Sequence, residues 1–275
     1  MSSITFSSCF YIIKSKFNKE KYIEWMNNFI SMVNNNFNLV IYTNKDSFDF
    51  IDTKDNKNIK VIIKEIDNFY NYKYKDYWIK NHEKNIYLNN SSVHQTIWEL
   101  NMLWSEKIWF VNETVKNKYF DTEFYGWCDI GYFRNSMTDL NTSSLLNVRW
   151  PNKSTVEMLN KSKIHYACVQ NDDNYLNYLK DIINNKNTDN LPTIPIPPNQ
   201  CSVAGGFFII HKTKSDWWAF SYDQKLQTYF KHDYLVKDDQ IILIDCIFSN
   251  ESDFALYREK NTQYDNWFMF QRILY

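Results

Sequence analysis

Glycine and proline are scarce in this chain: 4 glycines and 5 prolines occur among 275 residues, so each marks a position worth locating. No glycine-rich phosphate loop of the G-x-G-x-x-G or G-x-x-x-x-G-K-S/T kind occurs, which argues against dinucleotide-dependent oxidoreductases and P-loop NTPases. The 5 cysteines are scattered and include no C-x-x-C pair, which argues against a disulfide framework and a zinc knuckle. The net charge of −1 offers no basic footprint for nucleic acid or an anionic membrane.

Long apolar runs are also missing. None reaches the ~18 residues that a membrane-spanning helix requires, and no charged-then-apolar segment typical of a signal peptide opens the chain. We therefore expect a cytoplasmic protein with no membrane span and no nucleic-acid partner. Aromatic residues, in contrast, make up 18% of the chain. Most of these rings are expected in the core, and some could stack on sugars.

Apolar runs rich in Val, Ile, Phe and Tyr predict buried strands at residues 4–13, 39–42, 59–66, 124–129, 163–170, 203–211 and 254–257. Amphipathic segments predict helices at residues 19–35, 74–82, 92–116, 175–185, 216–230 and 241–248, the third opened by an S-x-x-Q capping box at 92–95. Loops are expected at 135–147 and at the proline-containing segment 186–202, which is long enough to suggest a function.

A helix between Val/Ile-rich strands favours a parallel sheet. We therefore predict an α/β fold with a mostly parallel (mixed) central sheet flanked by helices. No break in composition divides the chain, so residues 1–275 are expected to form a single domain.

The chain is organised around the stretch FYGWCDIGYFR at 124–134. It begins as a buried strand and leaves Asp129 at the carboxyl end, where open α/β sheets bind their ligands. Gly131 permits a sharp turn or a close approach by a ligand, and Arg134 offers a planar fork for phosphate oxygens. Asp129 could instead only cap a turn. Its position favours a site that holds a diphosphate or a sugar attached to one.

Four segments together resemble the HtrL/YibB-type glycosyltransferases, a branch of the GT-A superfamily. They are ITFSSCFY at 4–11, LVIYT at 39–43 with Trp25 and Phe29 ahead of it, KIWFVN at 107–112 leading into 124–134, and AGGFF at 204–208 with DDQ at 238–240. The resemblance implies a GT-A-like domain with a nucleotide-binding half at about 1–135 and an acceptor-side half at about 136–275. It also implies a nucleotide-sugar donor, first of all a UDP-sugar, and a glycan or other sugar acceptor.

The resemblance further implies a divalent metal, Mn²⁺ or Mg²⁺, bound at Asp129. The family motif is Asp-x-Asp, and here Gly131 stands in the place of the second carboxylate. Asp239 or His211 could supply the second ligand, or water could complete the shell. Asp239, and after it Asp238, is expected to act as the catalytic base, although either could simply cap the helix that follows.

For each of the remaining predicted site residues, a purely structural role is an alternative. The donor is expected to contact Ser8, Tyr11, Tyr42, Thr43, Lys107, Gly131 and Arg134, whereas core packing or solvated charge is the alternative for several of these. Gly205, Gly206 and Trp217 are expected on the acceptor side, with a β-bulge or helix packing as the alternative.

Two functions from different classes follow. The first is a nucleotide-sugar-dependent glycosyltransferase, and the second is a catalytically inactive GT-A-like binding or scaffold protein. The missing second carboxylate keeps the second alternative open. A phosphatase of the D-x-D-x-T type is disfavoured, because Asp129 is followed by Ile130 and Gly131.

Overall fold

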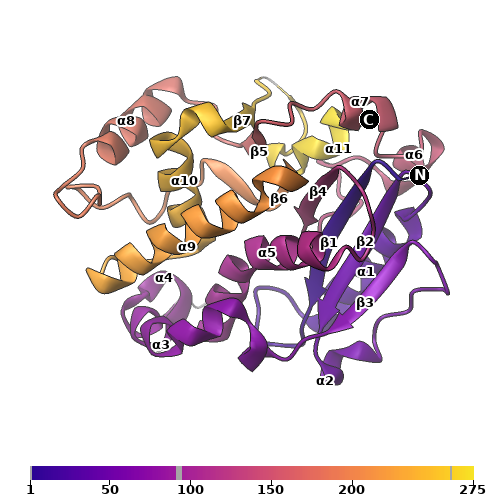
Figure 1. The fold of residues 1–275 in the computed structure, drawn as a ribbon, viewed down its shortest axis with the longest axis horizontal. Coiled ribbons are helices and arrows are strands. Elements are labelled where there is room, and N and C mark those ends of the chain that lie inside the picture. The colour runs from indigo at the N-terminus through magenta and orange to yellow at the C-terminus, as the bar shows by residue number, and fades with distance from the viewer. Residues whose placement is uncertain (1, 91–94, 261) are drawn as a thin grey trace.

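A computed structural model describes residues 2–90, 95–260 and 262–275. Its centre is one seven-stranded sheet in the order β3-β2-β1-β4-β6-β5-β7, which joins strands from both halves of the chain (Figure 1). The strands are β1 (Ile4–Phe10), β2 (Phe37–Thr43), β3 (Ile59–Ile63), β4 (Phe124–Cys128), β5 (Ile164–Cys168), β6 (Val203–His211) and β7 (Phe254–Tyr257). The α/β fold with a mixed central sheet is therefore confirmed.

Most neighbouring strands in this sheet are parallel. β1 runs parallel to β2 and β4, β2 to β3, and β5 to β7. The exception is β6, which is antiparallel to both of its neighbours, β4 and β5. The carboxyl ends of β1, β2 and β4 therefore lie at the same edge of the sheet as the amino end of β6.

The helices are α1 (Lys19–Met32), α2 (Lys45–Phe48), α3 (Lys75–Lys84), α4 (Ile86–Asn89), α5 (Trp98–Asn117), α6 (Thr142–Asn147), α7 (Lys153–Glu157), α8 (Asp173–Asn184), α9 (Ser215–Lys231), α10 (Asp239–Ser249) and α11 (Met269–Ile273). The capping box predicted at 92–95 lies outside the described residues except for Gln95, and α5 begins at Trp98. The segment 135–147, predicted as a loop, contains α6. Within the described chain, no helix combines the length and apolar content needed to cross a bilayer.

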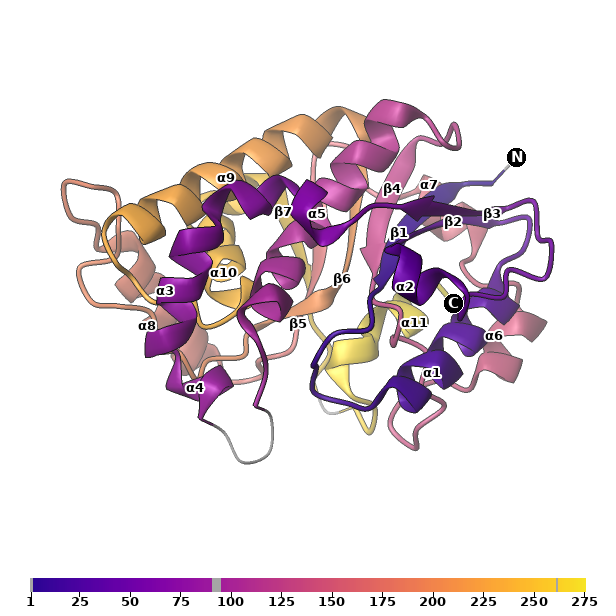
Figure 2. The same ribbon diagram turned by 90° about the horizontal axis from the view of Figure 1, so that it is seen from below.

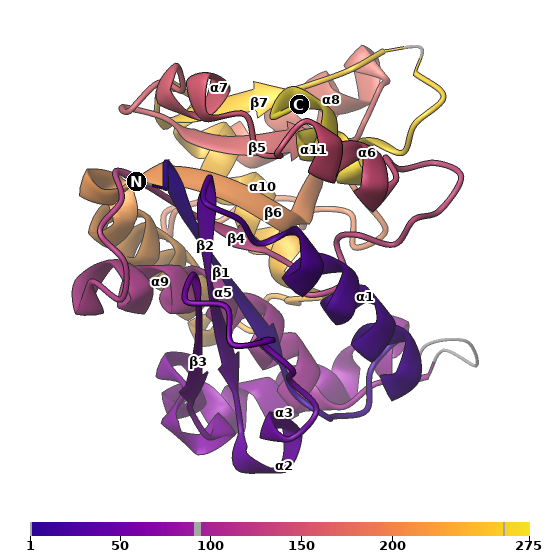
Figure 3. The same cartoon turned by 90° about the vertical axis from the view of Figure 1, so that its right-hand side faces the viewer.

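Helices cover both faces of the sheet, as Figures 2 and 3 show. Side chains alternate along each strand, so Val40 and Tyr42 of β2 join a core with α5, α9 and α10, whereas Leu39 and Ile41 join a second core with α1. α5 and α9 lie side by side on the first face (Figure 2). α10 is buried from Asp239 to Phe248, and most of its side chains are apolar.

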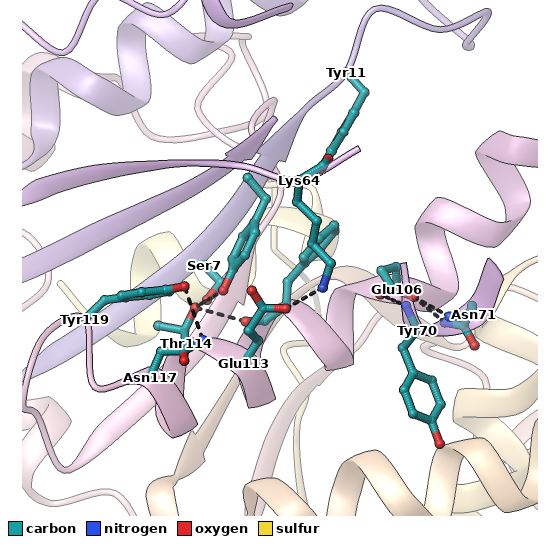
Figure 4. Close-up of polar contacts among 12 residues, drawn as sticks. Ser7, Tyr11, Lys64, Tyr70, Asn71, Glu106, Glu113, Thr114, Asn117 and Tyr119 are labelled. Atoms are coloured by element: carbon teal, nitrogen blue, oxygen red, sulfur yellow. Dashed lines mark hydrogen bonds and ion pairs between the residues drawn. The ribbon is translucent and has the colours of Figure 1, made fainter. Parts of the chain in front are cut away.

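Buried polar contacts fix α5, the helix that delivers Lys107 to the sheet edge (Figure 4). Glu106 accepts hydrogen bonds from the backbone N–H groups of Tyr70, at 2.6 Å, and Asn71, at 3.0 Å, and from the Asn71 side-chain amide at 2.8 Å. Burial raises the pKa of Glu106 to about 7, against the opposing effect of these donors. Further along α5, the Thr114 hydroxyl lies 2.8 Å from that of Ser7 on β1. These hydrogen bonds attach α5 to residues 70–71 and to β1.

Gly126 in the middle of β4 has no room for a side chain. A Cβ there would lie 2.4 Å from the backbone carbonyl oxygen of Phe208 and 3.2 Å from the Phe6 ring. We expect Gly126→Ala to lower the free energy of unfolding by about 1–3 kcal/mol, because strands β4 and β6 must separate to admit the methyl group. Urea denaturation measures this change, and an unchanged midpoint with an unchanged slope would contradict the expected close contact.

Candidate active site

The strand order brings several segments that are distant in sequence to one edge of the sheet. β1 and β4 end there, β6 begins there, and α10 starts beside it. Asp129 follows β4 directly, and its backbone N–H donates to the carbonyl oxygen of Gly206 at 2.8 Å. The prediction that Asp129 lies at the carboxyl end of a buried strand is therefore confirmed, and the start of β6 lies beside it.

A cleft of about 640 Å³ opens at this edge, within the ~300–1,000 Å³ typical of ligand sites. Its lining is a mixture of charged and aromatic side chains with backbone, and includes Lys16, Trp104, Lys107, Asp129, Arg134, Gly205, Asp238, Asp239, Trp267 and Phe268. A smaller recess of about 110 Å³, which shares Lys107, Asp129 and Arg134 with the cleft, continues towards Tyr11 and Gly131. The site is open to a ligand with both apolar and anionic parts.

At the base of the cleft, the Lys107 ammonium bridges two carboxylates. Its Nζ lies 3.2 Å from Asp129 Oδ1 and 3.3 Å from Asp239 Oδ2. It also donates to the carbonyl oxygen of Gly205 at 3.0 Å. Trp127 Nε1–H donates to the same Asp129 oxygen at 2.6 Å. The Lys107 and Asp239 side chains are 10% exposed and that of Asp129 is 35% exposed, so Asp129 is the member of this cluster that reaches furthest into the cleft.

The two adjacent glycines of β6 make room for these carboxylates. A Cβ on Gly205 would lie 2.7 Å from Asp239 Oδ2, and one on Gly206 would lie 3.0 Å from both Asp129 Oδ2 and Trp267 Nε1. Their backbone therefore forms the wall against which the acids pack. The structure places Gly205 and Gly206 beside Asp239 and Asp129. Their predicted contact with an acceptor stays a prediction.

Burial and charge set the protonation of this cluster. Burial alone would lower the pKa of Lys107, but Asp129 and Asp239 outweigh it and raise that pKa above its ordinary value. Lys107 is therefore an ammonium at any physiological pH. Burial raises the pKa of Asp239 to about 6; Lys107 opposes this shift, and Asp238 and Asp129 add to it. Asp239 is thus a carboxylate that accepts a proton more readily than an exposed aspartate does.

Asp238 lies beside Asp239 at the start of α10 and also lines the cleft. Its Oδ2 pairs with Lys237 Nζ at 2.6 Å, and its buried Oδ1 has no hydrogen-bond partner among the described residues. Asp238 occupies the N-cap position, yet its side chain makes no capping hydrogen bond. This oxygen is therefore a buried acceptor without a donor beside the cleft.

Arg134 lines both the cleft and the smaller recess, and Gly131 lines the recess. Arg134 Nε–H donates to the carbonyl oxygen of Gly131 at 2.8 Å, and its guanidinium lies 4.5 Å from the Trp25 ring and 5.2 Å from the Phe268 ring. A Cβ on Gly131 would lie 2.7 Å from the Trp25 ring, so this glycine lets the aromatic support approach. The fork of Arg134 is thereby held at the cleft.

Of the four residues from the ends of β1 and β2 that were predicted to contact the donor, only Tyr11 lines the site. It borders the smaller recess, and its hydroxyl donates to the Lys64 carbonyl oxygen at 2.9 Å. Ser8 is fully buried within β1. Tyr42 stacks on Phe110 with its hydroxyl 3.0 Å from Thr114, and Thr43 donates to the Phe10 carbonyl oxygen at 2.7 Å. Neither Ser8, Tyr42 nor Thr43 lines the cleft or the recess.

Two further predicted residues lie at the opposite edge of the sheet. Because β6 is antiparallel to β4, His211 pairs with Phe124 at the start of β4, far from Asp129 at its end. The prediction that His211 could join Asp129 in binding a metal is therefore wrong. Trp217 lies near the start of α9 on the same side, 6.1 Å from the Phe254 ring, and does not line the cleft.

The cleft also contains residues that the sequence did not single out individually. Lys16 follows β1 and lies 4.9 Å from the Trp104 ring of α5. Trp267 comes from the aromatic segment near residue 275, and residues 199–201 come from the proline-containing loop. In the sequence, only the unusual length of that loop and the aromatic residues near the end of the chain indicated that these segments could line a site.

The donor set at Asp129 does not suit Mn²⁺ or Mg²⁺. Asp129 Oδ1 already accepts from Trp127 and faces the Lys107 ammonium, which fills the gap to the nearest second carboxylate, Asp239. Across residues 2–90, 95–260 and 262–275, no three His, Cys, Asp or Glu side chains gather closely enough to hold a metal ion. Mg²⁺ demands near-ideal octahedral oxygen ligation, which an ammonium between the acids opposes.

Comparison with known proteins adds little beyond this geometry. No family model matches the chain, and no curated protein matches it. Membership of the HtrL/YibB-type family therefore stays a prediction from the motifs. Among solved structures, the chain is similar to mouse xyloside xylosyltransferase 1 in its apo form, with a TM-score of 0.48 and 10% identity over 93% of this chain and 84% of that one.

Proposed function

We propose that this protein is a glycosyltransferase that moves a sugar from a nucleotide-sugar donor, first of all a UDP-sugar, to a glycan or other sugar acceptor. The observation that carries the proposal is the Asp129–Lys107–Asp239 cluster at the base of a cleft of about 640 Å³. Carboxylates that face a cleft beside a guanidinium and aromatic rings suit a ligand that combines a sugar with a diphosphate.

Each residue has a role that its surroundings support. Asp239 accepts the proton of the acceptor hydroxyl as that oxygen bonds to the anomeric carbon, and the bond from this carbon to the diphosphate breaks. Arg134 faces the diphosphate oxygens and stabilises the charge that develops on them. Asp129 orients the sugar or ribose hydroxyls, and the recess beside Tyr11 takes the base. A direct displacement of this kind inverts the anomeric centre.

Donor binding tests this proposal through thermal stability. A panel of UDP-, GDP-, dTDP- and CMP-sugars is added to the purified protein, with and without Mn²⁺. A donor at a hundred-fold excess over its Kd is expected to stabilise the fold by about 2.7 kcal/mol. In titration calorimetry, Arg134→Gln is expected to weaken the same donor about tenfold to a hundredfold, because a charge-assisted hydrogen bond of about 1.5–3 kcal/mol is lost.

Arg149→Gln is the matched control, because Arg149 is exposed and does not line the cleft. It should bind the donor as the wild type does. A panel in which no nucleotide-sugar shifts the melting temperature would overturn the proposal and would favour the inactive scaffold protein. Equal effects of the two arginine substitutions would remove Arg134 from the diphosphate site.

A further inference from the structure

Lys107 occupies a position in this site that a metal ion would need. Its three ammonium protons face three protein oxygens: Asp129 Oδ1 at 3.2 Å, Asp239 Oδ2 at 3.3 Å and the Gly205 carbonyl oxygen at 3.0 Å. An ammonium has three donors, so no proton is left for a ligand. Lys107 therefore holds the two acids together and is not free to bind phosphate.

A divalent cation cannot share this position. Its oxygen ligands would have to approach to about 2.0–2.2 Å, and the ammonium stands between the only two acids of the cluster. Repulsion between a dication and a buried ammonium a few ångströms away is strong, because solvent screens it poorly. Trp127 Nε1–H, 2.6 Å from Asp129 Oδ1, further occupies the oxygen of Asp129 that faces the space between the two acids.

Two other cations of the cleft remain available for anionic oxygens. Neither Lys16 nor Arg134 forms an ion pair with any acid among the described residues, and both line the cleft. Aromatic rings support each of them, since Lys16 Nζ lies 4.9 Å from the Trp104 ring and Arg134 lies 4.5 Å from the Trp25 ring. Among the described residues, these two positive charges thus lie at the cleft without a carboxylate at ion-pair distance.

We propose that the transferase works without a divalent metal ion. Lys107 holds Asp129 and Asp239 in the place of a metal, and Lys16 and Arg134 neutralise the diphosphate of the donor. This inference rests on the proposed function and names the charges that serve it. It replaces the expectation of Mn²⁺ or Mg²⁺ that the family resemblance carries.

Calorimetric titration with UDP, GDP, dTDP and CMP separates this inference from the function on which it rests. The protein is titrated once in EDTA and once in Mn²⁺, and the nucleotide that binds is expected to give the same Kd in both. Binding that appears only with Mn²⁺ would overturn the inference and leave the transferase proposal standing. No binding under either condition would instead remove the transferase proposal.

Mn²⁺ alone gives a second test, read by electron paramagnetic resonance of the free ion. The wild type is expected to leave the free Mn²⁺ signal unchanged. Lys107→Ala vacates the space between Asp129 and Asp239 and is expected to reduce the free signal, whereas Lys107→Ala combined with Asp129→Asn should restore it. Lys107→Gln replaces Lys107→Ala if circular dichroism shows the latter to be unfolded.

Two results would overturn the inference. One is wild-type protein that binds Mn²⁺ and loses this binding in Asp129→Asn, which would place the metal at Asp129 despite the ammonium. The other is folded Lys107→Ala and Lys107→Gln protein that binds no Mn²⁺, which would show that the ammonium does not stand in a metal position.

Discussion

Replacing Asp239 by asparagine is expected to lower kcat for sugar transfer by about 10²–10⁴-fold while the protein still folds and binds its donor. Asn has the size of Asp but cannot take the proton of the acceptor hydroxyl. The Asp239 side chain is 10% exposed at the base of the cleft, and its Oδ2 is held 3.3 Å from Lys107, so the carboxylate is fixed where an acceptor can reach it. Steady-state kinetics with the best donor of the thermal panel measures the loss.

The pH dependence of the wild type checks the same role. Burial raises the pKa of Asp239 to about 6, and a base works only when it is deprotonated. The wild-type kcat should therefore fall as the pH drops below about 6 and stay level above it. The residual activity of Asp239→Asn should lack this acid limb. Asp181→Asn, an exposed position of α8 outside the cleft, is the matched control and should keep both kcat and the limb. A normal kcat in folded Asp239→Asn would exclude Asp239 as the base.

Local patterns in the sequence were sufficient to predict the central strands and the position of Asp129. The apolar runs at 203–211 and 254–257 coincide with β6 and β7, and Asp129 directly follows β4. Burial on both faces leaves an unbroken apolar signature in β4 and β6, whereas β7 is only partly buried. α10 begins at Asp239, where the acidic pair predicted a helix start. These features depend on residues that are close together in the sequence, so local sequence patterns can predict them.

Strand direction could not be read in the same way. An apolar run has the same period whether its strand is parallel or antiparallel, so the reversal of β6 left no mark in the sequence. That reversal alone decides that Gly205 and Gly206 lie at the acids and that His211 lies at the far edge. The placement of Trp217 away from the cleft has the same cause.

Lys107 shows a second limit of sequence reasoning. It lies within a twenty-residue helix, where a lone lysine is usually solvated. Only the family resemblance indicated that Lys107 belongs to the site. Its contacts with Asp129, Asp239 and Gly205 join three segments that are far apart in the chain. Packing of α5 against β1 and β4 creates these contacts, and no spacing along the chain encodes them.

Gly205→Ala is expected to lower kcat by about 10²-fold, although it changes no charged or hydrogen-bonding side chain. The new Cβ would lie 2.7 Å from Asp239 Oδ2, closer than atoms can approach, so the carboxylate has to move. Lys107 donates to the Gly205 carbonyl oxygen and to the same carboxylate, so the shift would also disturb the ammonium bridge. A displacement of about 1 Å at a reacting group costs about a hundredfold in rate.

Gly126→Ala provides the comparison that separates a displaced acid from a weakened fold. Both substitutions add one methyl group to a tightly packed strand, but at Gly126 the methyl meets the Phe208 carbonyl oxygen, whereas at Gly205 it meets Asp239. Gly126→Ala should therefore lower stability and keep the kcat of the folded protein, and Gly205→Ala should lose kcat even where urea denaturation shows it to be folded. If both variants lose activity only in proportion to their unfolded fraction, the position of the Asp239 carboxylate does not limit the reaction.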